Sequence, residues 1–435
     1  MKRLTAHIIA IGSELLHGGR IDSNSVGIAE VLAQSGIEVK QKVAVGDHEL
    51  DICTAVLSSA TQADVIVTTG GLGSTLDDCT REAVAAACGR TLVMRTQALR
   101  MVQAHLKTRN RALTPVMTRQ AFMPSRAFIL ENPVGTAPGF SLKVGKAQLF
   151  VLPGVPREAL AMAQVHIPLY FAKKYRRERR GLWSHSLNTV GISETEVQGH
   201  VMPLVKRYPS MQFSFLASTS GVKVTVSCWR VQELNKSDSK NIRPFPEGEG
   251  AVRNIRAALA PWLYSEGEER MEEVVGKLLA SRSLTLAVAE SCTGGLVAHR
   301  LTEVPGSSIY VDRGIVSYSN RAKQQLLGVR SLTLKQYGAV SLQVAHAMAK
   351  GIRKRSRVDV GLSLTGIAGP SGGSLEKPVG MVCMAIDGPY GTEARQFQFW
   401  GNRSEIKFRS SQAGLDFVRR YLLDRGGKKG DPAHG

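Results

Sequence analysis

Short apolar runs alternate with amphipathic segments near the start of the chain. The runs lie within residues 6–11 and 64–69, and each is short enough to be a buried strand, while the mixed segment 39–45 is a further expected strand. The segments between them, which extend to Leu32 and Ala60, have apolar positions at helical spacing. Strands that alternate with helices in this way predict an α/β fold with a parallel, doubly wound sheet.

The same alternation returns in the last third of the chain. An apolar run at 284–288 is followed by a segment with one apolar face at helical spacing, formed by Leu296, Val297, Ala298 and Leu301. A second run, at 358–365, leads into a glycine-rich loop, and residues 400–405 open a last helix. We therefore expect a second α/β domain at the C-terminal end.

Between these regions the pattern changes to that of a small α+β unit. Apolar or alternating segments at 187–190, 211–215 and 222–229 predict strands. Ser193 and Glu196 have the spacing of a capping box, which marks the start of a helix. The expected fold class of the whole chain is multi-domain α/β, with a small α+β connector between two α/β domains.

The composition is that of a globular protein, with 435 residues of which 43% are hydrophobic and 21% charged. No apolar run approaches the roughly 18 residues that a membrane helix needs, and the first residues lead into a strand rather than a signal peptide. The six cysteines lie far apart without a C-x-x-C pair, which argues against a zinc site or a disulfide framework. We expect a cytoplasmic protein that does not associate with membranes.

The formal net charge of +20 suits two kinds of partner, nucleic acid or anionic small molecules. Much of the positive charge lies in residues 173–180, 353–357 and 428–429. Aromatic residues do not alternate with these charges as a base-stacking surface requires. Solvated linkers and helix faces are therefore the favoured interpretation, and nucleic acid is not an expected partner.

Candidate catalytic residues follow the apolar run at 284–288. Ser291 falls at the predicted strand-to-helix turn, where its hydroxyl is held on a short, stiff element and the helix N-terminus favours negative charge on a nucleophile or an oxyanion. The alternative is an ordinary capped helix whose two glycines allow close packing against the sheet. The neighbouring Cys292 is a second candidate nucleophile, because a thiol is intrinsically more reactive.

A serine nucleophile needs a partner that takes its proton. Tyr318 and Lys323 follow another apolar run, and a lysine desolvated beside a tyrosine can lose its proton and act as the base. No histidine lies in either stretch. The alternative for Lys323 is a position on a solvated helix.

Two further segments are suited to binding anions. The run at 358–365 ends in a glycine-rich loop that begins at Gly366, whose backbone can approach a ligand. Arg403 stands at the start of the last helix, capped by Asn402 with Glu405 three residues further on. Either segment taken alone is weak evidence for a site.

In the N-terminal region the run at 64–69 also ends in a glycine-rich loop. This loop contains backbone positions suited to phosphates and two acids suited to a metal ion, namely Gly70, Gly71, Gly73, Thr75, Asp77 and Asp78. The alternative is purely structural, because Ser74 with Asp77 and Thr75 with Asp78 have capping-box spacing. The residues alone leave both interpretations open.

Together, these segments resemble a known family. The motifs occur in the order AESCTGG, GSS, YSN..K, GAVS, TGIAGP.GG...KPVG and G.R. This order resembles the C-terminal domain of the CinA (competence/damage-inducible) family. That domain is the nicotinamide mononucleotide amidohydrolase module, also called PncC. The resemblance covers residues 272–422. It implies that Ser291 is the nucleophile with Tyr318 and Lys323 beside it, and that Arg403 faces the substrate phosphate. It also implies substrate-binding roles for Glu290, Thr293, Gly294, Asn320, Thr365 and Gly366.

The N-terminal motifs IGSELL.GG.IDSN and GGLGST.DD.TRE, with segments 132–140 and 149–158, resemble the N-terminal half of full-length CinA proteins. That half is similar to molybdopterin-binding domains of the MoaB and MogA type. The resemblance implies a metal-dependent ADP-ribose pyrophosphatase site, with substrate-binding residues Gly70, Gly71, Gly73 and Thr75 and metal ligands Asp77, Asp78 and Glu14. Ser74 replaces the usual proline of GGLGPT, which loosens the loop but keeps both acids.

The resemblance also implies the domain organisation. We expect a MoaB/MogA-like domain at 1–175, a KH-like α+β connector at 176–266, an amidase domain at 267–425 and a disordered tail at 426–435. The G-x-x-G loop of true KH domains is not evident in the middle segment, which favours a connector over an RNA-binding module.

The expected function is deamidation of nicotinamide mononucleotide, with a second site that cleaves ADP-ribose. The resemblance implies a divalent metal ion as cofactor of the N-terminal domain and no cofactor for the amidase. It also implies that the protein is a homodimer. One rival is a competence or repair factor linked to nucleic acid, with decayed enzymatic sites. Another is an N-terminal domain that only binds a pterin.

Overall fold

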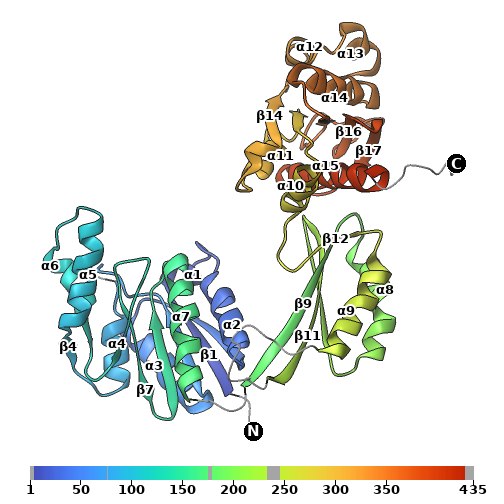
Figure 1. Ribbon diagram of the computed structural model, residues 1–435. Coiled ribbons are helices and arrows are strands. Elements are labelled where there is room, and N and C mark those ends of the chain that lie inside the picture. The colour runs from blue at the N-terminus through green and yellow to red at the C-terminus, as the bar shows by residue number, and fades with distance from the viewer. Residues whose placement is uncertain (1–3, 76, 175–178, 233–244, 427–435) are drawn as a thin grey trace. The chain divides into compact units, whose positions relative to one another are not determined.

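The computed structural model describes residues 4–75, 77–174, 179–232 and 245–426 (Figure 1). The chain divides into two compact units, Met1–Trp183 with Cys228–Pro244, and Ser184–Ser227 with Phe245–Gly435. The domain boundaries expected from the sequence stay predictions. The expected disordered tail, apart from Gly426 at the end of α15, lies outside the described residues, as do the basic residues 428–429 and part of the cluster at 173–180.

A six-stranded sheet forms the centre of the first unit, in the order β2-β1-β3-β8-β7-β6. Its strands are β1 (Leu4–Ile11), β2 (Ile37–Val45), β3 (Val65–Thr69), β6 (Phe128–Leu130), β7 (Gly139–Val144) and β8 (Ala147–Leu152). Strands β2, β1, β3 and β8 are parallel, as predicted. Strand β7 is antiparallel to both neighbours, because its two-residue connection to β8 is too short for a parallel crossover.

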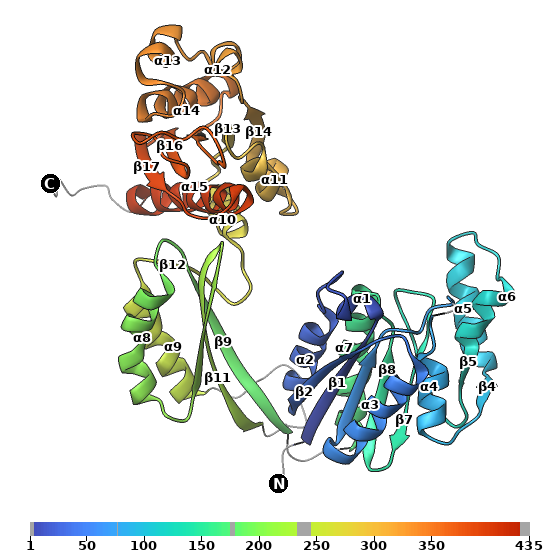
Figure 2. The same ribbon diagram turned by 180° about the vertical axis from the view of Figure 1, so that it is seen from behind.

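Helices cover both faces of this sheet (Figure 2). One buried cluster joins α2 and α7 to the sheet, and a second joins α3, α4 and α5 to the opposite face. The helices are α1 (Ser13–Leu16), α2 (Asn24–Gln34), α3 (Glu49–Gln62), α4 (Thr80–Ala87), α5 (Thr96–Thr108), α6 (Pro115–Thr118) and α7 (Pro156–Lys174), with β4 (Leu92–Met94) and β5 (Phe122–Pro124) as a separate strand pair. The doubly wound expectation is confirmed.

The middle segment has a four-stranded sheet in the order β10-β11-β9-β12, with two helices. Its elements are β9 (Arg179–Thr189), α8 (Glu194–Arg207), β10 (Gln212–Ser218), β11 (Gly221–Gln232), α9 (Pro246–Leu259) and β12 (Leu263–Glu266). The capping box before α8 is present: Ser193 Oγ accepts from the Glu196 amide at 3.3 Å, and the Glu196 carboxylate accepts from the Ser193 amide at 2.9 Å. The α+β expectation for this segment is thus met.

The C-terminal sheet has the order β14-β13-β15-β16-β17. Strand β13 is parallel to β14 and β15, whereas β16 and β17 complete the sheet as an antiparallel hairpin. The strands are β13 (Leu286–Glu290), β14 (Val311–Val316), β15 (Val360–Gly366), β16 (Met381–Gly388) and β17 (Gly391–Gln398). The central position of β13 brings the ends of β14 and β15 to either side of the turn that contains Ser291.

Helices also cover both faces of the C-terminal sheet (Figure 1). Helices α10 (Met271–Ser281), α11 (Leu296–Thr302) and α15 (Arg403–Gly426) share one buried cluster with the sheet. Helix α14 (Leu342–Ser356) covers the other face, with α12 (Asn320–Leu327) and α13 (Ser331–Tyr337) beside it.

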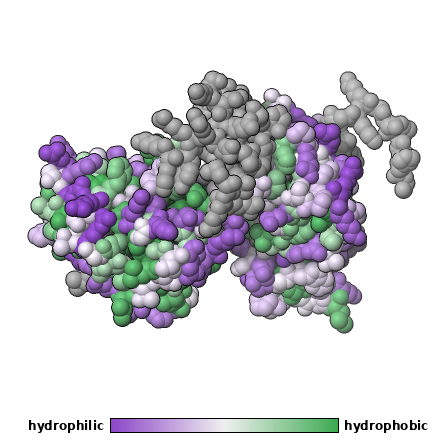
Figure 3. All heavy atoms as spheres, turned by 90° about the horizontal axis from the view of Figure 1, so that it is seen from below, coloured by the Kyte–Doolittle hydropathy of each residue, from purple (hydrophilic) through white to green (hydrophobic). Residues whose placement is uncertain are grey.

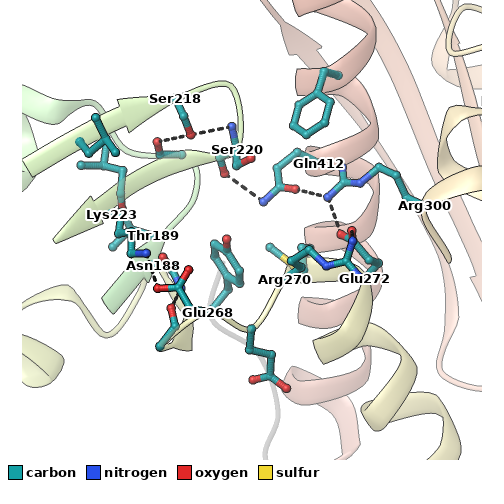
Figure 4. A pocket seen from close by; sticks show the side chains of 18 residues that line it. Asn188, Thr189, Ser218, Ser220, Lys223, Glu268, Arg270, Glu272, Arg300 and Gln412 are labelled. Carbon is teal, nitrogen blue, oxygen red and sulfur yellow. Dashed lines mark hydrogen bonds and ion pairs between the residues drawn. The ribbon is translucent and has the colours of Figure 1, made fainter. Parts of the chain in front are cut away.

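A buried arginine connects the helices on the first face (Figure 4). Arg300 of α11 is 7% exposed and donates to Glu272 of α10 at 2.8 Å and to Gln412 of α15 at 2.6 Å. Gln412 in turn donates to the carbonyl oxygen of Ser220, in the β10–β11 turn of the middle segment, at 2.9 Å. Because a buried guanidinium is costly without partners, this network fixes α15 against both neighbours.

No helix in the described ranges is both long enough and apolar enough to cross a bilayer. Figure 3 shows hydrophilic residues spread over the displayed face of each unit, with hydrophobic residues between them.

Candidate active site

The turn after β13 holds Ser291 at the carboxyl end of the middle one of the three parallel strands. The Ser291 amide donates to the carbonyl oxygen of Leu364 at 2.9 Å, which extends the β13–β15 ladder by one residue. Gly294 and Gly295 then adopt φ of 64° and 96°, a left-handed conformation that glycine reaches without strain. Helix α11 begins directly afterwards, so the predicted strand-to-helix turn is confirmed, with Ser291 only 7% exposed.

Glu290 fixes the shape of this turn. Its carboxylate accepts hydrogen bonds from the amides of Gly295 at 2.9 Å, Val297 at 3.2 Å and Ala298 at 2.9 Å. These amides belong to the first turn of α11, where donors lack partners within the helix. The sequence interpretation gave Glu290 a substrate-binding role, but the structure uses its buried carboxylate as a helix cap.

Lys323 is in direct contact with Ser291. Its Nζ lies 2.9 Å from Ser291 Oγ and also donates to the carbonyl oxygens of Ser317 at 2.8 Å and Tyr318 at 3.3 Å. The side chain is 1% exposed, which excludes the solvated helix position that the sequence left open. Burial disfavours the charged ammonium and lowers the pKa of Lys323 to about 8. About a tenth of the molecules therefore carry a neutral amine at pH 7, next to the serine hydroxyl.

The alternative nucleophile, Cys292, is in an unfavourable environment. It is 6% exposed, and burial raises the pKa of its thiol to about 12. Because the thiolate is the reactive form, this cysteine is protonated and unreactive near neutral pH. The environments of the two adjacent residues thus favour Ser291 over Cys292.

Tyr318 and Arg403 lie together at the rim of the site. Arg403 Nη2 donates to the Tyr318 hydroxyl at 3.2 Å, and its Nη1 donates to the carbonyl oxygen of Gly369 at 2.6 Å. Both side chains are exposed, and it is the backbone carbonyl of Tyr318, not its hydroxyl, that contacts Lys323. Asn402 and Glu405 form the expected cap of α15 and hold Arg403 at its first turn.

The remaining predicted residues of this site divide into buried and exposed groups. Thr365 is 1% exposed and donates to the Ala339 carbonyl oxygen at 2.8 Å, and Thr293 is fully buried beside the turn. Asn320 is exposed at the start of α12, and Gly366 ends β15, where the backbone of Met381 leaves no room for a side chain. The structure thus gives Thr365 a role in bracing the end of β15.

Lys407 is a candidate that the sequence interpretation missed. A methyl group built on Gly294 would lie 3.6 Å from Lys407 Nζ, so this ammonium is next to the turn that carries Ser291. Lys407 follows Arg403 by four residues on α15, which places both cations on one side of the helix. The i, i+4 spacing from Arg403 was the available signal in the sequence.

The predicted N-terminal site is a glycine-rich loop at the carboxyl end of β3. Gly70 and Gly71 have positive φ of 118° and 64°. Two residues of α4 hold the loop in place. Thr80 donates to the Gly70 carbonyl oxygen at 2.9 Å, and Arg81 donates to the Leu72 carbonyl oxygen at 2.7 Å. The loop is therefore braced by protein groups.

The capping-box spacing in this loop predicts a helix whose first turn contains Asp77 and Asp78, and the structure corrects this. Helix α4 begins at Thr80, so both acids precede it. The reason is that Asp78 folds back over the loop, where its carboxylate accepts from the amides of Gly73 and Thr75, each at 2.8 Å. The structural role anticipated from the Thr75 to Asp78 spacing is thus realised for Asp78.

The three predicted metal ligands do not form a preassembled metal site. In the described part of the chain, no three His, Cys, Asp or Glu side chains come together as a metal-binding group. The carboxylate of Asp78 is occupied by backbone amides, and Glu14 is exposed on the separate helix α1. These residues do not fit a metal ion held by protein ligands alone.

The fold and the site define a class of protein: a multi-domain α/β chain with a MoaB-like N-terminal domain and a C-terminal domain built around a buried serine–lysine pair. Residues 7–172 match the family described as a probable molybdopterin binding domain, and residues 268–422 match the CinA C-terminal domain. The chain belongs to the CinA family, and full-length relatives match it almost from end to end.

One such relative is a putative competence-damage inducible protein of Acetivibrio thermocellus, 37% identical over 97% of this chain and 99% of its own length. A CinA-like protein of Geotalea uraniireducens is 39% identical over 95% of this chain and 97% of its own. Among solved structures, the competence/damage inducible protein CihA from Agrobacterium tumefaciens is 42% identical, covers 35% of this chain and 93% of its own, and has a TM-score of 0.34.

The low pKa of Lys323 predicts a specific dependence of stability on pH. Between pH 8 and 10.5 the unfolded chain keeps the lysine proton while the folded chain has released it, so the free energy of unfolding should rise with pH. The wild-type protein should gain about 3 kcal/mol over this range relative to Lys323→Met. Denaturant titrations at several pH values measure this difference.

The matched control is Lys335→Met, an exposed lysine of α13, which should follow the wild-type protein at every pH. A difference between wild type and Lys323→Met that stays constant from pH 8 to 10.5 would mean that Lys323 keeps an ordinary pKa.

Proposed function

We propose that the C-terminal domain deamidates nicotinamide mononucleotide to nicotinic acid mononucleotide and ammonia. The observation that carries this proposal is the 2.9 Å contact between Lys323 Nζ and Ser291 Oγ in a buried site. A serine activated by a lysine of lowered pKa is suited to acyl transfer, in which an amide is converted to an ester on the enzyme. Membership of the CinA family supports the same class of reaction.

In this proposal Lys323 acts as the general base and then as the general acid. The neutral amine takes the Ser291 proton as Oγ attacks the carboxamide carbon, and the resulting ammonium returns a proton to the leaving nitrogen. Ammonia departs and leaves an acyl ester on Ser291. Water then attacks the ester, and Lys323 transfers its proton in the same way, which releases the carboxylate product and restores the serine.

The turn contributes the stabilisation of developing negative charge. The Glu290 carboxylate fixes the first turn of α11 through the amides of Gly295, Val297 and Ala298. In this proposal the positive end of that helix, which follows the nucleophile along the chain, favours the oxyanion.

Two cations at the rim account for the choice of a phosphorylated substrate. Arg403 can grip a phosphate as a fork at the start of α15, and Lys407 adds a second charge on the same side of the helix, beside Gly294. Tyr318, which Arg403 contacts, would then orient the phosphate-binding arginine. In this arrangement its hydroxyl has a binding role rather than the catalytic role expected from the sequence.

The alternative function is a competence or repair factor whose enzymatic sites have decayed. In such a protein, Ser291 and Lys323 would be expected to lie apart or to be exposed. The buried Ser291–Lys323 contact favours an active enzyme instead. Retention on DNA that weakens with salt, without turnover of nicotinamide mononucleotide, would support the rival.

We also propose a second activity, the cleavage of ADP-ribose to AMP and ribose 5-phosphate, in the N-terminal domain. The support is the glycine-rich loop at the carboxyl end of parallel strand β3, the edge at which α/β sheets bind ligands. Asp77 is exposed there, while the Asp78 carboxylate is engaged in the loop. A divalent metal requirement and a homodimer belong to this proposal.

The first prediction distinguishes the two adjacent nucleophiles. Ser291→Ala should lower kcat/KM for nicotinamide mononucleotide by at least about a thousandfold, because it removes the attacking atom. Cys292→Ala should stay within roughly tenfold of the wild-type protein, because the thiol is buried and protonated. Chromatography of nicotinic acid mononucleotide measures both. The opposite order of losses would contradict the assignment of Ser291.

The second prediction concerns the substrate phosphate. Arg403→Ala should lower kcat/KM for nicotinamide mononucleotide about ten- to a hundredfold, since a charge-assisted contact is worth roughly 1.5 to 3 kcal/mol. It should change little for the unphosphorylated riboside, which has no group for the arginine to hold. Arg330→Ala, at an exposed arginine of the same domain, serves as the control. Equal proportional losses on both substrates would show a purely structural arginine.

The third prediction separates the two domains. Asp77→Asn should lower AMP formation from ADP-ribose by about a hundredfold or more while leaving the deamidation of nicotinamide mononucleotide unchanged. Asp51→Asn, an exposed acid of α3, is the control. The assay is run with Mg²⁺ and with EDTA. Full activity of the Asp77 variant would remove this residue from the site.

A further inference from the structure

A cleft of about 690 Å³ lies in the second unit, away from the serine–lysine pair. Strand β17 and helix α15 of the C-terminal domain form one wall, and the start of α8 with the β10–β11 turn forms the other. This volume is within the range of roughly 300 to 1,000 Å³ that is typical of small-molecule sites. Such sites commonly lie where two domains meet, as this one does.

The C-terminal wall of the cleft is aromatic. Phe397 and Phe399 stack with ring centroids 5.8 Å apart and planes 8° from parallel, and Phe417 meets Phe397 edge-on at 6.5 Å. Trp400 extends from the end of this wall and is 75% exposed. A large exposed indole beside a row of phenyl rings offers a flat surface on which a planar ring can stack.

One arginine in the cleft has an unmet hydrogen-bonding group. The Nε of Arg409 is buried and has no hydrogen-bond partner among the described residues. Its neighbours are engaged: Arg420 pairs with Asp416 at 2.7 Å, and Arg395 lies over the Phe417 ring at 5.0 Å. Among the described residues Arg409 has no hydrogen bond or ion pair, so its guanidinium is the cation in this cleft that is available to an anionic ligand.

This arginine does not belong to the proposed amidase site. At about 100° per residue along α15, Arg409 is about 120° around the helix from Arg403 and about 160° from Lys407. Gln412, Asp416 and Arg420, which also line the cleft, are within about 60° of Arg409. Helix α15 therefore presents two separate polar faces.

We propose that this cleft binds a nucleoside 5′-phosphate, with its base stacked on Trp400 and its phosphate bound by Arg409. A planar aromatic surface and a guanidinium within one cleft recognise the two halves of such a ligand. Ser218, Thr219 and Ser220 of the β10–β11 turn line the same cleft and supply polar groups beside the ribose. The middle segment thereby gains a role in forming a ligand site.

The position of Trp400 connects this site to the rim of the proposed amidase site. Trp400 is three residues before Arg403. Asn402, which lies between them in the sequence, forms the cap of α15 together with Glu405.

The test is the binding of 5′-AMP to the full-length protein by isothermal titration calorimetry, with adenosine and ribose 5-phosphate as partial ligands. We expect saturable binding of AMP and at least about tenfold weaker binding of each half. Arg409→Met should weaken AMP binding about ten- to a hundredfold, and Trp400→Leu at least about fivefold. Arg330→Met, an exposed arginine outside the cleft, should bind like the wild-type protein.

The calorimetric measurement does not depend on turnover, so its result is distinct from that of the amidase assays. Absence of AMP binding to the wild-type protein overturns the proposal. AMP binding that is unchanged in both Arg409→Met and Trp400→Leu also overturns it, because the ligand then occupies another site. Unchanged melting temperatures of the variants exclude loss of fold as the reason for weaker binding.

Discussion

The C-terminal site depends on an ammonium group that is buried against a serine hydroxyl. Three oxygen atoms, from Ser291, Ser317 and Tyr318, surround Lys323 Nζ, and no carboxylate is among these partners. Hydrogen bonds to neutral oxygens are sufficient to keep the side chain in place but leave the charge only partly compensated. The same burial that lowers the pKa of Lys323 costs stability at pH values where the ammonium stays charged.

Other elements of the domain hold this pair in position. Strands β13 and β14 end side by side, which places Ser291 and Ser317 at the same edge of the sheet, and α12 then returns Lys323 to that edge. Glu290 fixes the turn that contains Ser291, because its carboxylate accepts hydrogen bonds from three amides at the start of α11. Glu290 immediately precedes Ser291, so a substitution that displaces the Glu290 backbone also displaces Ser291.

Periodicity and motif order predicted much of this arrangement. The central strand, the turn at Ser291 and the cap of α15 follow from local sequence, because apolar runs and capping residues act within a few positions. The contact of Lys323 with Ser291 joins residues 32 positions apart, and the motif resemblance anticipated it although no local rule does. Lys407 was missed although its i, i+4 spacing from Arg403 could be read from the sequence. Arg409 was missed because the neighbours of a cation on a long helix are known only once the helix is packed.

Local spacing was ambiguous where one carboxylate had two plausible uses. Glu290 ends a strand and Asp78 lies between a strand and a helix, and both positions are typical of ligand-binding acids. In the structure both are satisfied by backbone amides instead. The choice depends on the local path of the chain, which brings free amides within reach and which composition does not reveal.

Helix α15 runs for 24 residues, from the rim of the serine–lysine site past the network around Gln412. At about 1.5 Å per residue, the nine positions from Arg403 to Gln412 span about 13 Å of a stiff rod. Gln412 is hydrogen-bonded to Ser220 of the middle segment. A small tilt of α15 at Gln412 would therefore displace Arg403 at the start of the helix, without any change in the helix itself. The middle segment thus fixes one end of the helix that carries Arg403, and insertions near Ser220 would change the position of that arginine from a distance.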